Sequence, residues 1–397
     1  MATSVQISRT VQIPDPLRVS RYHKIPELGP RVLFFSGGSA INGLSKTLKN
    51  YTHNSIHLVT PFDSGGSSAV LREAFDMPSI GDLRSRLMAL ADESVLGHPE
   101  IYELFAYRLP LDEGAKELCK RLDAMINGEY EKVACISNPM RQLICNQLGY
   151  FRVAMPKDFD LRGASIGNLI LTGGYLNNHK ELDPIIFLFS KLVNVHGTVK
   201  AIVNDNLHLF ATLEDGSEVC GQHRLTGKEV PPVSSSITHL GLSAERDCAK
   251  PATSRVRKKV RKLIGSADLI CYPPGSFYTS LLANLLPSGV SEAIAANDCP
   301  KVFIPNPTND PEQYGMDAQS LIRRLSEYLK SDLSRKSQRR VLNFVLMDPR
   351  HGRYPEGFTH ELLQELHVEM IPVRLISKRS APYYDNELRV SALLSLT

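Results

Sequence analysis

Glycines and small polar residues gather at two places where an apolar run of the chain ends. Residues 36–39 read Ser-Gly-Gly-Ser, and residues 63–68 read Asp-Ser-Gly-Gly-Ser-Ser. A glycine turn bends sharply and lets a phosphate approach the main-chain N–H groups, because glycine has no Cβ. Tight packing explains the first turn alone equally well, but the hydroxyl groups of the second suit phosphate or sugar oxygens. The candidate phosphate-binding residues of the two turns are Gly37, Gly38, Ser39, Ser64, Gly65, Gly66 and Ser67.

Asp63 begins the second turn and is the candidate catalytic residue and the candidate metal ligand. It follows the first glycine pair by roughly 25 residues, close to the spacing at which Rossmann-like folds place the carboxylate that holds a ribose hydroxyl. The same carboxylate suits a metal ion such as Mg²⁺ equally well, because hard cations prefer oxygen ligands. Both roles stay open on the sequence alone.

Several well-known motifs are missing or incomplete. The first turn does not fit the dinucleotide fingerprint G-x-G-x-x-G, and the sequence contains no P-loop motif. Residues 163–167 match the nucleophile elbow G-x-S-x-G, but this motif requires a buried strand before it, and the polar residues 156–162 do not form one. We therefore reject the hydrolase interpretation. As the start of a helix, Ser165, Gly167 and Asn168 remain a candidate anion site.

Three other groups of residues favour a structural explanation. His53 and His57 have a spacing found in some metal sites, but no Cys or His follows at zinc-site spacing, and His57 falls in a predicted strand. The basic residues of the run 255–262 surround apolar residues at helical spacing, which predicts a solvated helix face. The seven cysteines are scattered without a C-x-x-C pair and are typical of reduced thiols.

The composition is that of an ordinary globular protein. With 397 residues the chain is long enough for one large or two medium cores, and Lys plus Arg exceed Asp plus Glu by four, 46 against 42. This excess is too small to predict a nucleic-acid partner. No apolar run approaches the roughly 20 residues of a membrane helix, and the first residues do not have the pattern of a signal peptide. We expect a cytoplasmic protein that binds neither membranes nor nucleic acid.

The elements that must position these turns alternate between strands and helices. Apolar runs predict strands at residues 32–35, 55–60, 267–272, 301–305, 341–347 and 370–375, and amphipathic helices follow most of them. This alternation predicts an α/β, Rossmann-like three-layer fold, with a mostly parallel sheet and helices on both faces. Ligands of such folds bind at the carboxyl ends of the strands, where both glycine turns fall.

Two segments interrupt this alternation, and one precedes it. Residues of about 84–130 have helical periodicity and predict a helical excursion. Between about 198 and 225 the period falls to 2, and the step Asp215-Gly216 predicts a hairpin in a small antiparallel β element, which a loop at 226–250 follows. Residues 1–30 contain four prolines and no sustained period, so we expect an extended arm ahead of a single domain at 31–397.

Five stretches together resemble the CofD/YvcK family, in order and in content, over about residues 31–376. They are residues 36–39, residues 63–68, Gly-Asp-Leu-Arg at 81–84, Ser-Ile-Gly-Asn at 165–168, and Pro-Gly-Ser-Phe-Tyr-Thr-Ser at 274–280 with Asn284. The motif Glu-Leu-Gly-Pro at 27–30, joined to the first turn, further resembles a CofD-like branch found beside ATP-grasp and kinase-like genes, the GAK system. The segment 31–397 thus resembles a CofD-like nucleotide-binding domain, and ATP-grasp and kinase-like proteins are candidate partners.

The resemblance implies a Rossmann-like core, usually a homodimer, that binds a nucleotide diphosphate or a nucleotide-sugar at these loops. The further candidate nucleotide-binding residues that it adds are Gly81, Asp82, Arg84, Ser165, Gly167, Asn168, Gly275, Ser276, Tyr278, Thr279 and Asn284. CofD itself transfers 2-phospho-L-lactate from a guanosine-diphosphate-linked donor to a hydroxyl of a deazaflavin, with Mg²⁺, whereas YvcK-type relatives bind UDP-sugars and act as metabolic regulators. The resemblance therefore implies either a transferase of a phosphate-linked group, which we favour, or a non-enzymatic UDP-sugar sensor.

Overall fold

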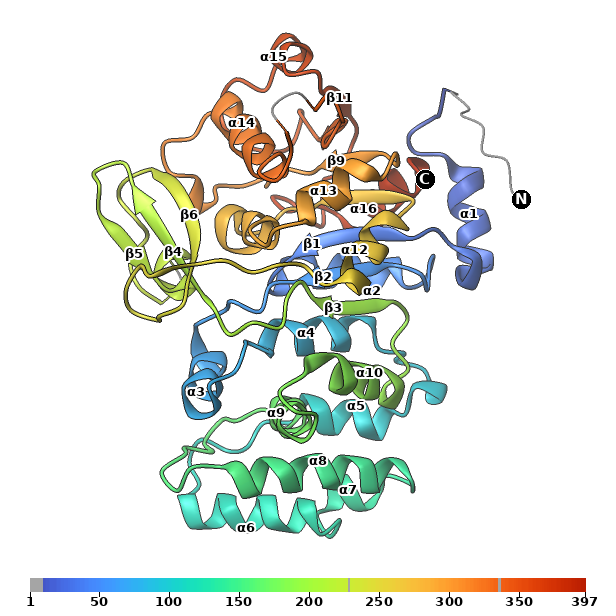
Figure 1. Ribbon diagram of the computed structural model, residues 1–397. Helices are drawn as coiled ribbons and strands as arrows, with labels where there is room; N and C mark the ends of the chain where they lie inside the picture. Colours follow the sequence, from blue (N-terminus) through green and yellow to red (C-terminus); the bar gives the residue numbers. More distant parts are fainter. Residues whose placement is uncertain (1–9, 228, 335–336) are drawn as a thin grey trace.

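A seven-stranded parallel sheet forms the centre of the molecule (Figure 1). The computed structural model describes residues 10–227, 229–334 and 337–397. The order of the strands is β11-β10-β9-β8-β1-β2-β3, and all neighbouring pairs run parallel. Their bounds are β1 Val32–Ser36, β2 Ile56–Val59, β3 Thr198–Ala201, β8 Leu269–Tyr272, β9 Lys301–Phe303, β10 Phe344–Met347 and β11 Glu369–Pro372. The predicted Rossmann-like α/β fold is confirmed.

The direction of the chain across this sheet reverses beside β1. From β1 the chain moves outward to β2 and β3 on one side, and it later returns to β8 on the other side of β1. In open parallel sheets this reversal leaves a crevice at the carboxyl ends of the two strands that flank it. The loops after β1 and β8 therefore meet at the place where ligands bind in such folds.

Helices cover both faces of the sheet, and side chains alternate between them. Val32 and Phe34 of β1 pack toward α2 and α16, whereas Leu33 and Phe35 pack toward α12, α13 and α14. Every residue of β1 is buried, as expected of a strand that both layers cover. The bounds of these helices are α2 Asn42–Leu48, α12 Lys258–Gly265, α13 Val290–Ala296, α14 Ala318–Leu329 and α16 Asn386–Ser395.

Helices also form a block beside the β3 edge of the sheet, in the lower part of Figure 1. This helical block comprises α3 Gly66–Phe75, α4 Gly81–Leu90, α5 Pro99–Ala106, α6 Ala115–Ile126, α7 Glu131–Ala134, α8 Met140–Ala154, α9 Ile166–Asn177 and α10 Leu182–Leu192. It has its own hydrophobic core, to which β2 and β3 contribute Val59 and Val199. The predicted helical excursion is present, and the helices continue well beyond residue 130 to Leu192.

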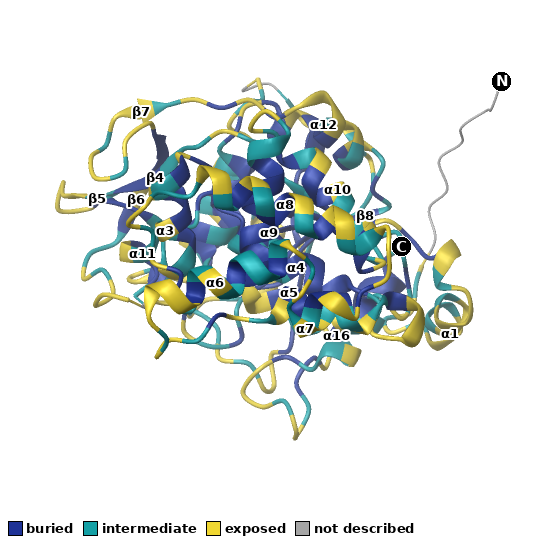
Figure 2. Cartoon of the chain, turned by 90° about the horizontal axis from the view of Figure 1, so that it is seen from below, coloured by how far each residue is buried: buried dark blue, intermediate teal, exposed yellow. Residues whose placement is uncertain are grey.

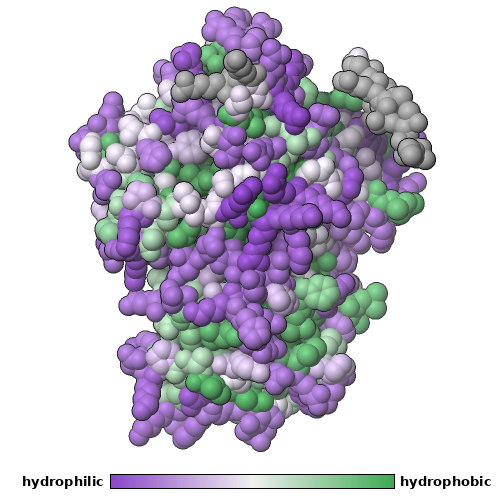
Figure 3. Space-filling view, viewed as in Figure 1, coloured by the Kyte–Doolittle hydropathy of each residue, from purple (hydrophilic) through white to green (hydrophobic). Residues whose placement is uncertain are grey.

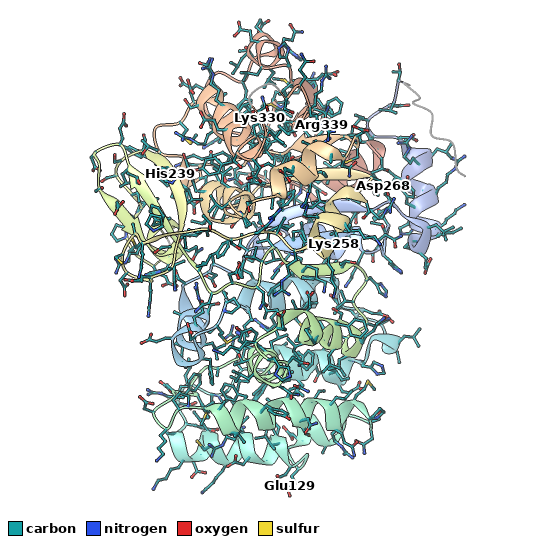
Figure 4. The ribbon with its side chains drawn as sticks, viewed as in Figure 1. Glu129, His239, Lys258, Asp268, Lys330 and Arg339 are labelled. Carbon is teal, nitrogen blue, oxygen red and sulfur yellow. The ribbon has the colours of Figure 1, made fainter. Side chains whose placement is uncertain are left out.

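The helices of the block have the amphipathic pattern from which the sequence predicts them. In α6 the buried residues are Leu118, Leu122 and Met125, which recur at helical spacing and define one apolar face. Seen from below in Figure 2, α6 and α8 carry exposed residues on the outside and buried residues toward the interior. Glu129, labelled in Figure 4, lies at the lower end of this block, and Lys330 lies in the upper part of the molecule beyond α14.

A separate four-stranded antiparallel sheet, in the order β5-β4-β6-β7, lies at the left of Figure 1. Its strands are β4 His208–Leu213, β5 Glu218–Cys220, β6 Ile237–Ser243 and β7 Pro251–Ala252. The predicted hairpin turn is confirmed, because Leu213 and Ser217 are hydrogen-bonded around Asp215 and Gly216. Two predictions here are wrong. Residues 198–201 are β3 of the parallel sheet, because they pair with β2, and the expected loop at 226–250 contains β6.

The expected extended arm is also wrong for its second half. Asp15 accepts a hydrogen bond from the N–H of Arg18 and so caps α1 (Pro16–Lys24), with Pro16 at the first helical position. The N–H of Asp15 donates to the hydroxyl of Ser395, which ties α1 to α16. The first nine residues of the arm lie outside the described residues.

The remaining elements are short. They are η1 Pro26–Leu28, η2 Ser39–Ile41, η3 Val95–Gly97, η4 Phe277–Leu281, η5 Leu282–Leu285, η6 Pro311–Gln313, α11 Gln222–Leu225 and α15 His360–Glu365. All seven cysteines are free thiols, as predicted. Within the described ranges, no helix combines the length and the apolar character needed to cross a membrane.

Candidate functional site

The first glycine turn follows β1 and is held from behind by a buried arginine. Arg86 of α4 is fully buried, and its Nη2 donates to the carbonyl oxygens of Gly37 and Gly38 at 3.3 and 3.1 Å. Its Nη1 donates to the hydroxyl of Ser45 at 2.7 Å. In trans peptides the N–H points opposite to the carbonyl, so the N–H groups of Gly38 and Ser39 are directed away from Arg86. Burial lowers the pKa of Arg86 to about 10, and the nearby charge of Asp82 opposes that shift.

The second glycine turn connects β2 to α3 and carries Asp63. The Asp63 carboxylate accepts a hydrogen bond from the N–H of Gly65 at 3.2 Å. Gly66, the first residue of α3, has a φ of +45° with open space around its Cβ position, so its conformation is the one that glycine adopts most readily. The N–H of Gly66 donates to the carboxylate of Glu229 at 3.0 Å. A carboxylate of the protein itself therefore lies at the N-terminus of α3, where a ligand anion is expected.

Ser64 and Arg72 connect this turn to the segments around the antiparallel sheet. The hydroxyl of Ser64 is buried and lies 2.9 Å from Nδ1 of His223, whose main-chain N–H also donates to it. Arg72 donates to the carbonyl oxygens of Phe62 and Asp63 through Nη1 and to that of Leu207 through Nη2. Burial lowers the pKa of Arg72 to about 10. The main chain of Asp63 is thus fixed by a buried guanidinium, as the first turn is by Arg86.

The start of α4 lies between the two turns. A Cβ built on Gly81 would lie 2.6 Å from the Ser68 hydroxyl and 3.9 Å from Oδ2 of Asp63, so α4 begins directly against the second turn. The next residue, Asp82, faces the first turn, because its Oδ1 lies 3.5 Å from the Cβ position of Gly38. Two carboxylates, from Asp63 and Asp82, therefore flank the start of α4.

The start of α9 is adjacent to these turns. Asn168 donates through Nδ2 to the hydroxyl of Ser67 at 3.4 Å, which joins the first turn of α9 to the first turn of α3. A Cβ built on Gly167 would lie 2.9 Å from Cδ of Arg84 and 2.6 Å from the carbonyl oxygen of Phe105, so only glycine allows this close approach. Ser165 precedes α9 without capping it, and no buried strand leads into it. The rejection of a nucleophile elbow is therefore confirmed.

The loop after β8 borders the site on the side of β1 opposite to β2. A Cβ on Gly37 would lie 2.6 Å from the Ser280 hydroxyl, and a Cβ on Gly275 would lie 3.5 Å from the Cβ of Ala40. Buried Asn284 donates to the carbonyl oxygens of Ser36 and Ser280 at 3.0 and 2.8 Å. This amide ties the end of β1 to the loop after β8.

Two buried carboxylates accept hydrogen bonds from the main-chain N–H groups of this loop. The N–H of Phe277 donates to Asp310 at 2.9 Å, and the N–H groups of Tyr278 and Thr279 donate to Glu312 at 2.8 and 2.9 Å. The hydroxyl of Thr279 also donates to Glu312, at 2.5 Å. Burial and the neighbouring Asp310 raise the pKa of Glu312 to about 8. The helical segment after Ser276 therefore presents its first N–H groups to the protein and not to a ligand, which differs from the expected anion-binding helix start.

The predicted site residues thus form two groups. Some line a cavity, and others hold the loops of the site in place. A cavity of about 110 Å³ lies between the first turn and the loop after β8, and its lining includes Gly37, Gly38, Ser39, Gly275 and Ser276. The Tyr278 hydroxyl donates to the carbonyl of Ile237, and Thr279 is bonded to Glu312, so both side chains are bonded inside the protein. The structure brings all five stretches together through the contacts above, with Tyr278, Thr279 and Asn284 in supporting positions.

Sequence reasoning missed several residues of this region. They are Arg72, Arg86, His223, Glu229, Asp310 and Glu312. Arg86 had a detectable signal, because it occupies the same helix face as Leu83, Leu87 and Leu90, which are all buried. His223 and Glu229 lie far along the chain from the turns that they contact, and nothing local to them indicates that contact.

The residues interpreted as structural are so in the fold. His57 is fully buried in β2 and stacks on Phe34, and burial together with the charge of Arg86 holds its pKa well below its ordinary value. Only the later part of the basic run lies in α12, which begins at Lys258 (labelled in Figure 4) with Val260 and Ile264 buried beneath it, whereas Arg255 and Arg257 precede the helix. Within the described residues, no group of three or more His, Cys, Asp and Glu side chains is arranged to hold a metal ion.

Comparison with known proteins agrees with this architecture. The family model described as "2-phospho-L-lactate transferase CofD" matches residues 32–370. A "putative gluconeogenesis factor" of Nostoc is 29% identical over 71% of this chain, and that match spans only 48% of the Nostoc protein. The "gluconeogenesis factor" of Listeria monocytogenes is 29% identical over 70% of this chain and 67% of its own length. That of Bacillus subtilis is 29% identical over 71% and 69%.

A solved structure shares the fold. A crystal structure of a UPF0052-family protein from Bacillus halodurans superposes with a TM-score of 0.67 at 23% sequence identity, covering 92% of this chain and 99% of that one. The family match extends over most of the chain and includes every glycine and serine turn described above. The chain therefore belongs to the CofD family.

Proposed function

We propose that the chain transfers a phosphate-linked group from a nucleotide diphosphate donor to a hydroxyl of an acceptor. One observation carries the proposal: a continuous series of contacts joins the turns after β1, β2 and β8 to the starts of α3, α4 and α9. Main-chain N–H groups and helix N-termini stabilise phosphate oxygens. The donor's diphosphate would lie along Gly37, Gly38 and Ser39, and its transferred group would lie toward Asp63.

The proposed step exchanges one bond to phosphorus for another. The acceptor's hydroxyl oxygen forms a bond to the distal phosphorus of the diphosphate, and the bond from that phosphorus to the bridging oxygen breaks. The nucleoside monophosphate leaves with the electron pair, and the proton of the hydroxyl passes to the Asp63 carboxylate. The residues around α4 and α9 would stabilise the charge on the phosphoryl oxygens.

We propose that Mg²⁺ would be held at this place. Asp63 and Asp82 present carboxylates on either side of the start of α4, and Mg²⁺ is commonly held by one or two carboxylates together with substrate phosphates. When bound, the ion would neutralise phosphate charge. We propose that Asp82 would hold it together with the substrate phosphates, and that Asp63 would serve either as a second ligand or as the base described above.

A second candidate function is a nucleotide-sugar sensor without chemistry. The relatives from Listeria and Bacillus subtilis that match most of this chain are called gluconeogenesis factors, a name that describes a metabolic role and no reaction. A sensor would use the same turns to hold a UDP-sugar and would leave it intact.

Ligand screening followed by phosphorus NMR separates the two. The protein is screened by thermal shift against UDP-sugars, GDP and dinucleotides, and each stabilising compound is incubated with protein and Mg²⁺ while its phosphorus spectrum is recorded. A new monophosphate signal in the presence of an acceptor supports the transferase, and binding with an unchanged spectrum supports the sensor. Stabilisation by none of the nucleotides overturns both, and full turnover by Asp63→Asn would overturn the role given to Asp63.

A further inference from the structure

A second, larger cavity of about 290 Å³ opens on the other side of the contact between Ser67 and Asn168. Its walls come from α3, from the segment between α5 and α6, and from the loop before α9. The apolar part of the lining includes Val70, Leu71, Leu111 and Phe159. On the face drawn in Figure 3, hydrophobic side chains are also numerous over the lower, helical part of the molecule, but a cavity of this size offers an apolar ligand more contact than a flat surface does.

The polar part of this lining carries more positive than negative charge. Arg108 and Arg162 both line the cavity, and Asp160 is the carboxylate among the described lining residues. Arg162 is paired with Asp160 at 2.7 Å. Arg108 donates only to the carbonyl oxygen of Gly163, at 3.0 Å, among the hydrogen bonds of the described residues. Guanidinium groups that lack a carboxylate partner bind acidic groups well, because their N–H groups form charge-assisted hydrogen bonds.

The position of Arg108 is fixed by main-chain pairing. Arg108 lies opposite Ser165 in an antiparallel bridge, and the flanking N–H groups of Leu109 and Ile166 donate to Ala164 and Tyr107 at 2.9 and 3.0 Å. Opposed residues of an antiparallel pair carry their side chains on the same face. Arg108 and Ser165 are therefore held on one side of this short ladder, at the start of α9.

Two buried polar atoms in this lining lack a partner in the fold. Ser165 and Asn168 are each 1% exposed, and neither the Ser165 hydroxyl nor Oδ1 of Asn168 has a hydrogen-bond partner among the described residues. Ser165 stands at the position that usually caps a helix, yet its side chain forms no capping bond with α9. Buried polar groups are nearly always satisfied in folded proteins, so these two atoms of cavity-lining residues indicate a missing hydrogen-bonding partner.

This cavity shares a wall with the proposed donor site. Ser67 lines the cavity, and the next residue, Ser68, lies against Gly81 at the start of α4, which also approaches Asp63. A molecule in the cavity would therefore lie next to the place where the transferred phosphate group is expected.

We propose that this cavity binds the second substrate, a compound with an apolar or aromatic body, an acidic group that Arg108 binds, and a polar group that bonds to Ser165 and Asn168. The word substrate rests on the proposed function, whereas the binding chemistry rests on the cavity alone. Arg108 would then determine specificity, because it selects an acid over a neutral compound of the same shape.

The test uses two fluorescent probes that differ in charge. 8-Anilinonaphthalene-1-sulfonate has an aromatic body and an acid, and N-phenyl-1-naphthylamine has the same body without the acid. We expect Arg108→Gln to weaken binding of the sulfonate about tenfold, because a charge-assisted bond is lost. Binding of the neutral probe should change by less than about twofold, because the apolar walls are intact. Val70→Trp, which fills the cavity from the exposed side of α3, should weaken both probes.

A matched arginine provides the control. Arg141 on α8 is half-buried and also donates a single hydrogen bond to a main-chain carbonyl, that of Ala134 at 3.1 Å. Arg141→Gln should leave both probes unchanged, and thermal melting of every variant shows that it is folded. Equal effects of Arg108→Gln on the two probes, or no effect of Val70→Trp, would overturn the proposal. Titration with GDP and UDP in parallel keeps it distinct from the proposed function, since loss of nucleotide binding alone would overturn only the latter.

Discussion

Buried charged side chains hold the loops of the candidate site in place. Arg86 donates hydrogen bonds to the carbonyl oxygens of the first glycine turn, and Glu312 accepts hydrogen bonds from N–H groups of the loop after β8. Each is fully enclosed, so the charge of Arg86 carries a large cost of desolvation that its hydrogen bonds must offset, whereas Glu312 avoids that cost by staying protonated up to about pH 8. These residues do not line the first cavity, yet the conformation of its walls depends on them.

Replacing Arg86 by methionine should damage both stability and ligand binding. The carbonyl groups of Gly37 and Gly38 would lose their buried donor, so we expect the free energy of unfolding to fall by about 3 kcal/mol. Nucleotide affinity should fall as well, because the turn is no longer fixed. Urea unfolding and nucleotide titration measure the two effects. Arg323→Met, at an exposed position of α14, is the control, and unchanged nucleotide affinity in Arg86→Met would contradict the positioning role.

Glu312 should make stability depend on pH. Its pKa in the folded state, about 8, lies above its ordinary value near 4.5, because burial and Asp310 disfavour the charged form. The folded state therefore binds a proton more tightly than the unfolded state does. The stability that this group contributes is fully present below about pH 4.5 and is lost as the pH rises through 8. Glu312→Gln keeps the shape of the neutral form and should remove this loss.

Thermal unfolding of the wild type and of Glu312→Gln at pH 5 and pH 8 checks this expectation. The difference in melting temperature between the two proteins should be larger at pH 8 than at pH 5, with Glu312→Gln the more stable at the higher pH. A difference that does not change with pH would show that Glu312 is ionised in the fold throughout this range.

At the scale of elements, close contacts between helices position the start of α9. Gly173 of α9 packs directly on α8, since a Cβ at this position would lie 1.8 Å from the carbonyl oxygen of Gln147. No side chain fits between the two helices there. The contact fixes α9 against the block and so fixes Ser165 and Asn168 relative to the second turn.

Two glycine-to-alanine substitutions in this pair of helices should have opposite effects. Gly173→Ala should push α9 away from α8 and lower the free energy of unfolding by about 3 kcal/mol, as overpacking does in well-packed cores. Gly149→Ala in α8 is the matched control, because its Cβ would be in ordinary contact, 3.9 Å from Ile126. That change should stabilise the helix by about 0.5–1 kcal/mol. Chemical denaturation of both variants gives the comparison, and similar effects of the two would contradict it.

At the N-terminus of α3, the carboxylate of Glu229 lies where a ligand anion would bind. This carboxylate accepts the hydrogen bond of the Gly66 N–H that a phosphate oxygen would otherwise accept. We expect Glu229→Gln to bind a nucleotide diphosphate several-fold more tightly, because the competing negative charge is removed. Calorimetric titration measures the affinity, with Glu214→Gln, an exposed glutamate after β4, as the control. Weaker binding in Glu229→Gln would instead identify Glu229 as part of the ligand's own environment.

Much of the secondary structure could be predicted because the central strands are buried on both faces. The runs at β1, β8 and β10 are continuous apolar segments, which few other elements produce. The alternation of Thr198–Ala201 is that of a half-exposed hairpin strand, and only the pairing with β2 identifies this segment as the edge strand β3. The prolines of the first 30 residues favour an extended arm, although Asp15 and Pro16 do signal a helix start.

The candidate site was predictable to the extent that its residues are consecutive in the chain. The turns at 36–39 and 63–68 are visible as runs of glycine and serine, and their meeting follows from the parallel sheet. Residues that reach them from a distance, such as His223 and Asp310, have no local pattern. Belonging to a motif also does not show whether a residue contacts a ligand or holds a loop in place. Thr279 belongs to a motif, yet its hydroxyl is bonded to Glu312 inside the protein.

At the scale of the whole molecule, the site is assembled from parts of three hydrophobic cores. The first turn belongs to β1, which separates the two cores of the main sheet, and the starts of α3, α4 and α9 belong to the core of the helical block. A ligand that contacts all of these loops would link the sheet and the block. Stabilisation by the ligand should therefore extend to both, because anything that binds only the folded state stabilises all the parts that it joins.

The insertion of the helical block between two neighbouring strands has a consequence for the order in which the chain folds. β2 pairs with β3 through contacts such as Ile56 with Thr198, although the whole block separates them in the chain. Closing so long a loop is entropically costly, whereas helices form through local contacts. We expect pulse-labelled hydrogen exchange during refolding to protect α8 and α9 before β3, and the reverse order would contradict this. The folded block would then bring its own two ends together, so that the edge of the sheet is completed by a structure that has already formed.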